Sequence, residues 1–119
     1  MRDETSLTRV VATSRPQESE IFLLQLKGPR IGARIFLAEG ETVIGRSSSC
    51  QVVLDVESVS RRHCSLLVVG HEVHLLDLGS TNGTWINGRR IQPQEPVALE
   101  VGDRIELGEI VYKLLRQGE

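Results

Sequence analysis

From residue 20 onward the sequence consists of short apolar runs separated by turn-forming glycine, asparagine, aspartate and proline. Several runs alternate with a period of two: Ile105 and Leu107 face one way, and Arg104 and Glu106 face the other. No window of eleven or more residues carries the 3.6-residue period and the capping signals of a helix. The runs are 21–27, 34–37, 42–44, 51–54, 64–69, 72–78, 84–86, 97–99, 104–107 and 110–115. About ten short runs at this spacing predict an all-β domain, an antiparallel sandwich or barrel.

The chain has the length and composition of one globular domain. Its 119 residues are 39% hydrophobic and 25% charged, which is ordinary globular usage. A domain of this size buries roughly 65–70% of the surface of its unfolded chain, so it needs no disulfide to stand. We expect a flexible polar tail over 1–19, the domain over 20–116, and a C-terminal end or the start of a linker over 117–119.

Charge and cysteine usage exclude several functions. The net charge of −2 argues against binding to nucleic acid, because proteins that bind the phosphate backbone are usually basic. No apolar run approaches the ~20 residues of a membrane span, and the N-terminus lacks the apolar core of a signal peptide. Cys50, Cys64 and the three histidines show no zinc-binding spacing. We therefore expect a cytoplasmic protein with two reduced thiols, no metal and no cofactor.

Three loops concentrate the polar residues. They are 45–49 with Arg46 and three serines, 58–63 with Ser60 and two arginines, and 78–84 with Thr81 and Asn82. Together they offer guanidinium, hydroxyl and amide donors, with no carboxylate among them. Such a set suits a doubly charged oxyanion, because charge-assisted bonds from arginine are supported by neutral donors.

The order of the motifs in these loops resembles that of a known family. Gly45-Arg46 is followed by Ser60-x-x-His63 and then by Ser80-Thr81-Asn82-Gly83-Thr84. This pattern is similar to the forkhead-associated (FHA) domain, a β-sandwich that reads phosphothreonine through arginine-based contacts. The resemblance covers roughly residues 20–116, and it includes Asp77-Leu78, Ile86-Asn87-Gly88 and Gly102-Asp103-x-Ile105-x-Leu107-Gly108.

The resemblance implies a sandwich of two twisted antiparallel sheets, with about eleven strands and with the binding loops at one end. It implies that Arg46 and Ser60 contact the phosphate and that Arg61 adds a further contact. Thr81 would lie beside the phosphothreonine, and Asn82 would bond the peptide main chain. The residues carried over as structural are Gly45, His63 and Gly83.

Ordinary structural roles compete with these assignments. Ser60 could cap a turn through its own backbone, and Arg61 with Arg62 could be a solvated pair. Asn82-Gly83 is itself a two-residue hairpin signal, which we consider compatible with ligand contact because the Asn82 side chain remains free. The Arg89-Arg90 pair could favour acidic residues in the peptide or keep the loop soluble, and we favour solubility. We expect His63 to be a buried, hydrogen-bonded residue and place four aromatic residues in the core: Phe22, Phe36, Trp85 and Tyr112.

The resulting hypothesis is a non-catalytic, phosphothreonine-dependent interaction module in signalling. Ser60 and His63 lack an orienting carboxylate within their motif, which argues against a hydrolase. A phospho-independent assembly domain and the sensory head of a larger signalling protein remain as alternatives. The expected partner is a phosphothreonine protein, a substrate of a Ser/Thr kinase. A second candidate partner is the chain's own N-terminal tail, phosphorylated at Thr5 or Thr8, which lie near its acidic residues.

Overall fold

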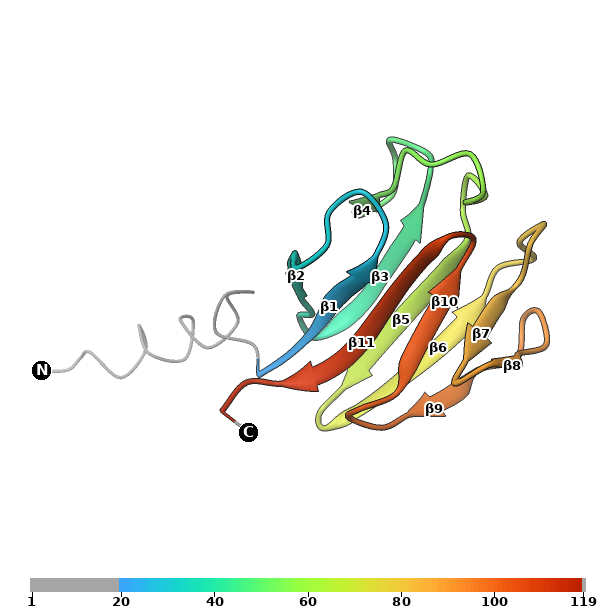
Figure 1. Cartoon of the computed structure of the whole chain (residues 1–119). Helices are drawn as coiled ribbons and strands as arrows, with labels where there is room; N and C mark the ends of the chain where they lie inside the picture. Colours follow the sequence, from blue (N-terminus) through green and yellow to red (C-terminus); the bar gives the residue numbers. More distant parts are fainter. Residues whose placement is uncertain (1–19, 119) are drawn as a thin grey trace, which may run out of the picture.

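The computed structural model describes residues 20–118, which form eleven strands in two sheets (Figure 1). One sheet has the strand order β2-β1-β11-β10-β7-β8, and the other has the order β4-β3-β5-β6-β9. The strands are β1 (Ile21–Lys27), β2 (Arg34–Phe36), β3 (Gly40–Gly45), β4 (Val52–Val53), β5 (Cys64–Val69), β6 (Glu72–Asp77), β7 (Thr84–Ile86), β8 (Arg89–Arg90), β9 (Val97–Leu99), β10 (Arg104–Leu107) and β11 (Ile110–Arg116).

The all-β prediction is confirmed, with two differences in detail. Strand β8 was not expected, because Arg89 and Arg90 carry no apolar signal. Its position follows from a tight turn at Asn87-Gly88, where both residues have positive φ (51° and 84°), as the favoured two-residue hairpin turn requires. Strand β4 is parallel to β3, because the chain leaves β3 at Gly45 and returns at Val52 to lie beside Ile44.

The hairpin interpretation of Asn82-Gly83 was wrong. Strands β6 and β7, which flank this pair, belong to different sheets and are not hydrogen-bonded to each other. The segment 78–83 therefore crosses from one sheet to the other. The hairpin turn lies at Asn87-Gly88, between the paired strands β7 and β8.

The core follows the predicted alternation along the strands. Ile105 and Leu107 of β10 are buried, and Arg104 and Glu106 are exposed. Two of the four aromatic residues expected inside, Phe22 and Tyr112, are buried, and Phe36 is half-buried. Trp85 is also half-buried and lies outside the core cluster. The reason is strand geometry: Thr84 and Ile86 face the interior, so Trp85 between them faces outward.

The three polar loops meet at one end of the sandwich, at the upper right in Figure 1, where hydrogen bonds join them. Cys50 and Cys64 are buried free thiols. The part of the chain from 20 to 118 contains no helix that could cross a membrane. Within the same residues no three metal-ligating side chains gather into a site.

Candidate functional site

Backbone hydrogen bonds join the first two loops. The Arg46 amide donates to the Ser60 carbonyl at 2.9 Å, and the Ser47 amide donates to the Arg61 carbonyl at 3.0 Å. Gly45 makes this approach possible, because a Cβ at that position would overlap the Arg61 carbonyl oxygen and lie 2.8 Å from its carbonyl carbon. The glycine before Arg46 is therefore required by close packing of two backbones.

The Arg46 side chain is exposed but anchored. Its Nε donates to the Val59 carbonyl at 2.9 Å, which holds the guanidinium against the second loop. Within residues 20–118, no group accepts a hydrogen bond from the two terminal nitrogens of this guanidinium. These nitrogens can form a bidentate contact with an oxyanion.

Ser60 connects the second loop to the third. Its Oγ accepts a hydrogen bond from the Thr81 amide at 3.0 Å. The hydroxyl proton is not used in that bond, so a half-buried Ser60 can still donate to a ligand. The hydroxyl does not contact the histidine of the motif. His63 instead accepts, at Nδ1, from the Ser60 backbone amide at 3.0 Å.

His63 is fully buried and bonded through both ring nitrogens. Since Nδ1 is an acceptor, the proton of the neutral ring lies on Nε2, which donates to the Gly83 carbonyl at 2.9 Å. Burial lowers the pKa of His63, although the bond to Gly83 and the negative charge of Asp77 act against this shift. A neutral His63 thus joins the second loop to the third.

Asp77, a residue not among the predicted site residues, organises the third loop through hydrogen bonds to both of its carboxylate oxygens. Its Oδ2 accepts from the amides of Gly79 and Ser80 at 3.0 and 3.2 Å. Its Oδ1 accepts from the hydroxyls of Ser80 and Thr84, both at 2.6 Å. Burial alone would raise the pKa of Asp77, but these four hydrogen bonds outweigh it and lower the pKa. An aspartate three residues before a serine at a loop start is a recognisable turn signal, and it could have revealed this role.

Asn82 lies exposed on the third loop, and its side chain is not free as expected. Its Nδ2 donates to the Ser58 carbonyl at 2.9 Å, which ties the third loop to the second. The amide oxygen receives no hydrogen bond within the described residues, so it can accept from a ligand. Ser58 was also not among the predicted residues; its Oγ accepts from the Glu109 amide at 3.0 Å.

The structure thus brings four of the predicted residues together: Arg46, Ser60, Thr81 and Asn82. Arg61 is exposed, and its backbone carbonyl belongs to the same network. Thr5 and Thr8 lie outside the described residues. The assembled surface carries an arginine and several neutral donors, and the nearby Asp77 carboxylate is buried beneath the loop and already occupied. This chemistry fits a phosphate.

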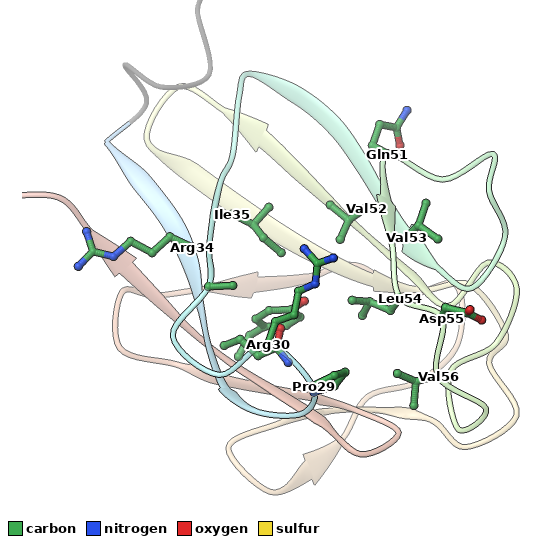
Figure 2. Close-up of a pocket in the computed structure, with 13 residues that line it drawn as sticks. Pro29, Arg30, Arg34, Ile35, Gln51, Val52, Val53, Leu54, Asp55 and Val56 are labelled. Atoms are coloured by element: carbon green, nitrogen blue, oxygen red, sulfur yellow. The ribbon is translucent and has the colours of Figure 1, made fainter.

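Away from the polar loops, a cavity of about 600 Å³ opens between the two sheets, and Figure 2 labels residues that line it. One wall is the segment with Val52, Leu54 and Val56, and Arg30 extends across the space. Tyr112 also lines it, and its buried hydroxyl has no hydrogen-bond partner in residues 20–118. The lining mixes aliphatic side chains with two arginines, two glutamines and Asp55, so a carboxylate stands among its donors, unlike at the loop end.

Comparisons with known proteins identify the family of this chain. A family model described as the FHA domain matches residues 42–108. An oxoglutarate dehydrogenase inhibitor of Corynebacterium efficiens is 34% identical over 82% of this chain and 66% of its own length. The glycogen accumulation regulator GarA of Mycobacterium tuberculosis is 33% identical over 82% of this chain and 60% of its own length. The chain therefore spans about two thirds or less of these relatives.

Solved structures show the same fold. One comes from a structural and functional analysis of phosphothreonine-dependent FHA domain interactions; its TM-score is 0.74 and its identity is 33%, over 85% of this chain and 100% of that chain. Another is the FhaA FHA domain complexed with the intracellular domain of Rv3910. Its TM-score is 0.71 and its identity is 35%, over 79% of this chain and 98% of that chain.

Proposed function

Because the chain belongs to the FHA domain family, we propose that it is a non-catalytic module that binds phosphothreonine peptides in protein–protein signalling. One observation carries the proposal: Arg46 is anchored to the Val59 carbonyl beside a Ser60 hydroxyl that is itself oriented by the Thr81 amide. The donors are held in place before any ligand arrives, so little order is lost on binding.

The mechanism is electrostatic capture followed by main-chain recognition. A phosphothreonine carries a charge of about −1.5 to −2 at neutral pH. It would accept from the Arg46 guanidinium and the Ser60 hydroxyl, and each such charged bond contributes roughly 1.5–3 kcal/mol. Arg61 would add a second cation, Thr81 would lie beside the phosphoresidue, and Asn82 would accept from the peptide main chain through its amide oxygen.

Catalysis does not fit the geometry. A nucleophilic serine needs a base within hydrogen-bond reach of its hydroxyl. Here the Ser60 hydroxyl is bonded to the Thr81 amide, and the His63 ring is bonded to two backbone groups. His63 is thus committed to holding the loops together, and within the described part of the chain the Ser60 hydroxyl proton has no base that could accept it. We also place the module in the cytoplasm, since its two cysteines are unpaired thiols.

The test is the affinity of Arg46→Ala for a phosphothreonine peptide, measured by calorimetry. We expect a loss of about 2–5 kcal/mol in binding free energy, because the substitution removes charge from an exposed side chain. The variant should remain folded, with about 1 kcal/mol less stability because the bond to the Val59 carbonyl is lost. Arg62→Ala is the matched control, since Arg62 is also an exposed arginine of these loops but has no assigned contact. Equal affinities of wild type and Arg46→Ala would refute the assignment. Equal binding of the unphosphorylated peptide would favour a phospho-independent assembly domain.

A second proposed ligand is the chain's own N-terminal segment, phosphorylated at Thr5 or Thr8. About a dozen residues separate Thr8 from β1, and an extended segment of that length spans up to roughly 40 Å. A tethered ligand would act at high effective concentration, near millimolar for a short tether. Phosphorylation of this segment should then weaken binding of an external phosphothreonine peptide, and an unchanged affinity would refute self-binding.

A further inference from the structure

Arg90 occupies a defined place beside the third loop. It lies on β8 opposite Trp85, in the register Trp85↔Arg90. Its guanidinium carbon is 5.9 Å from the centroid of the indole ring, within the range of a cation–π contact. Its Nε would lie 2.5 Å from a Cβ built on Gly83, so the guanidinium packs against the Gly83 backbone.

The third loop links this arginine to the phosphate site through consecutive residues. The Thr81 amide bonds to Ser60. The carbonyl of the next residue, Asn82, accepts from the Trp85 Nε1 at 3.4 Å, and Arg90 lies over the same indole ring. Arg90 packs against Gly83, which follows Thr81 by two residues, so it lies about two residue lengths along the loop from the Ser60 contact. Successive residues of an extended chain are about 3.3–3.6 Å apart, so a peptide that lies along Asn82 would bring a residue two or three positions from the phosphothreonine to Arg90.

We propose that Arg90 is a specificity-determining residue that binds an acidic side chain flanking the phosphothreonine, an inference that rests on the proposed function. Arg90 is exposed, and no carboxylate within residues 20–118 pairs with it. Its planar guanidinium is oriented by the Trp85 ring, and an oriented guanidinium matches a carboxylate with two parallel hydrogen bonds. The outward position of Trp85, which the core prediction did not anticipate, thereby gains a role.

Arg89 provides a matched control. It is the neighbouring residue on β8, carries the same charge and is also exposed. Its partner in the strand pair is Ile86, and side chains of adjacent strand residues point to opposite faces. Substitution of either arginine removes one positive charge from the same strand, so general electrostatic attraction changes similarly in both variants. Only a local contact would distinguish them.

The experiment measures the affinities of phosphothreonine peptides in pairs that differ by Glu or Gln at one position, for each of three positions on either side of the phosphoresidue. We expect wild type to prefer Glu about two- to fivefold at one or two of these positions, the range of an exposed ion pair. Arg90→Gln should lose that preference, and Arg89→Gln should keep it, in variants with wild-type melting temperatures.

A preference that persists in Arg90→Gln, or that falls equally in both variants, would overturn the proposal. So would the absence of any preference in wild type. These outcomes are separable from failure of the proposed function, because each is a ratio between two phosphorylated peptides, whereas the proposed function predicts the difference between phosphorylated and unphosphorylated peptides. If wild type bound phosphorylated and unphosphorylated peptides equally, both the proposed function and the role of Arg90 would be refuted.

Discussion

Replacement of Asp77 by asparagine tests whether one buried carboxylate holds the third loop in shape. In the native protein the two oxygens of Asp77 accept four hydrogen bonds, two from amides and two from hydroxyls. An asparagine oxygen can keep only one of these pairs. If it keeps the amides of Gly79 and Ser80, its NH₂ group faces two hydroxyls that must rotate to accept.

The magnitude follows from the change in bond type. A hydrogen bond to a charged group contributes about 1 kcal/mol more than a neutral one, so four bonds together would lose about 4 kcal/mol. Relief from the burial of a charge offsets part of this loss. We therefore expect the free energy of unfolding of Asp77→Asn to be lower than that of wild type by about 2–3 kcal/mol.

Urea unfolding at pH 7, followed by the fluorescence of Trp85, measures this difference. Asp55→Asn is the control, because Asp55 is an exposed aspartate for which we expect a change within about 0.5 kcal/mol. The effect should also depend on pH. Since the folded-state pKa of Asp77 is lowered, its stabilisation is complete above the unfolded pKa of about 3.9 and is lost as pH falls through the folded pKa. The difference in free energy of unfolding between wild type and Asp77→Asn should therefore become smaller below about pH 4. A difference in free energy of unfolding below about 0.5 kcal/mol at pH 7, the range usual for surface substitutions, would refute the reasoning.

Two further predictions concern Tyr112 and the pH dependence of binding. Burial raises the pKa of Tyr112 to about 12, and its hydroxyl has no partner in the described residues, so Tyr112→Phe should leave the free energy of unfolding unchanged or raise it by about 1 kcal/mol. A loss greater than 1 kcal/mol in the same urea assay would contradict this account of the hydroxyl. Phosphopeptide affinity should weaken from pH 7.5 to 5.5, because the phosphate loses its second charge near pH 6. Calorimetry at several pH values measures the effect, and its disappearance in a folded His63 variant would show that the histidine, which we place as neutral and structural, is its source.

Local sequence patterns were sufficient to predict most of the strands. Five predicted runs match the observed strands at both ends: β1, β5, β7, β9 and β10. These segments combine an alternating or β-branched apolar pattern with turn residues at their ends, and both signals are local. Strand β8 carries neither signal in its side chains, because two arginines form a strand only where β7 offers them a partner.

For the site, the sequence by itself determined which chemical groups are present and in what order they occur. Arg46, Ser60, Thr81 and Asn82 stand in three separate loops, and their donor chemistry is independent of folding. Only the tertiary structure decided how they are held: Asn82 is bonded to the Ser58 carbonyl, Asp77 supports the third loop, and Arg90 lies over an outward-facing Trp85. The physical reason is that these contacts depend on which sheet each strand joins and which face each side chain takes. Strand pairing between distant segments sets both, and no local pattern records it.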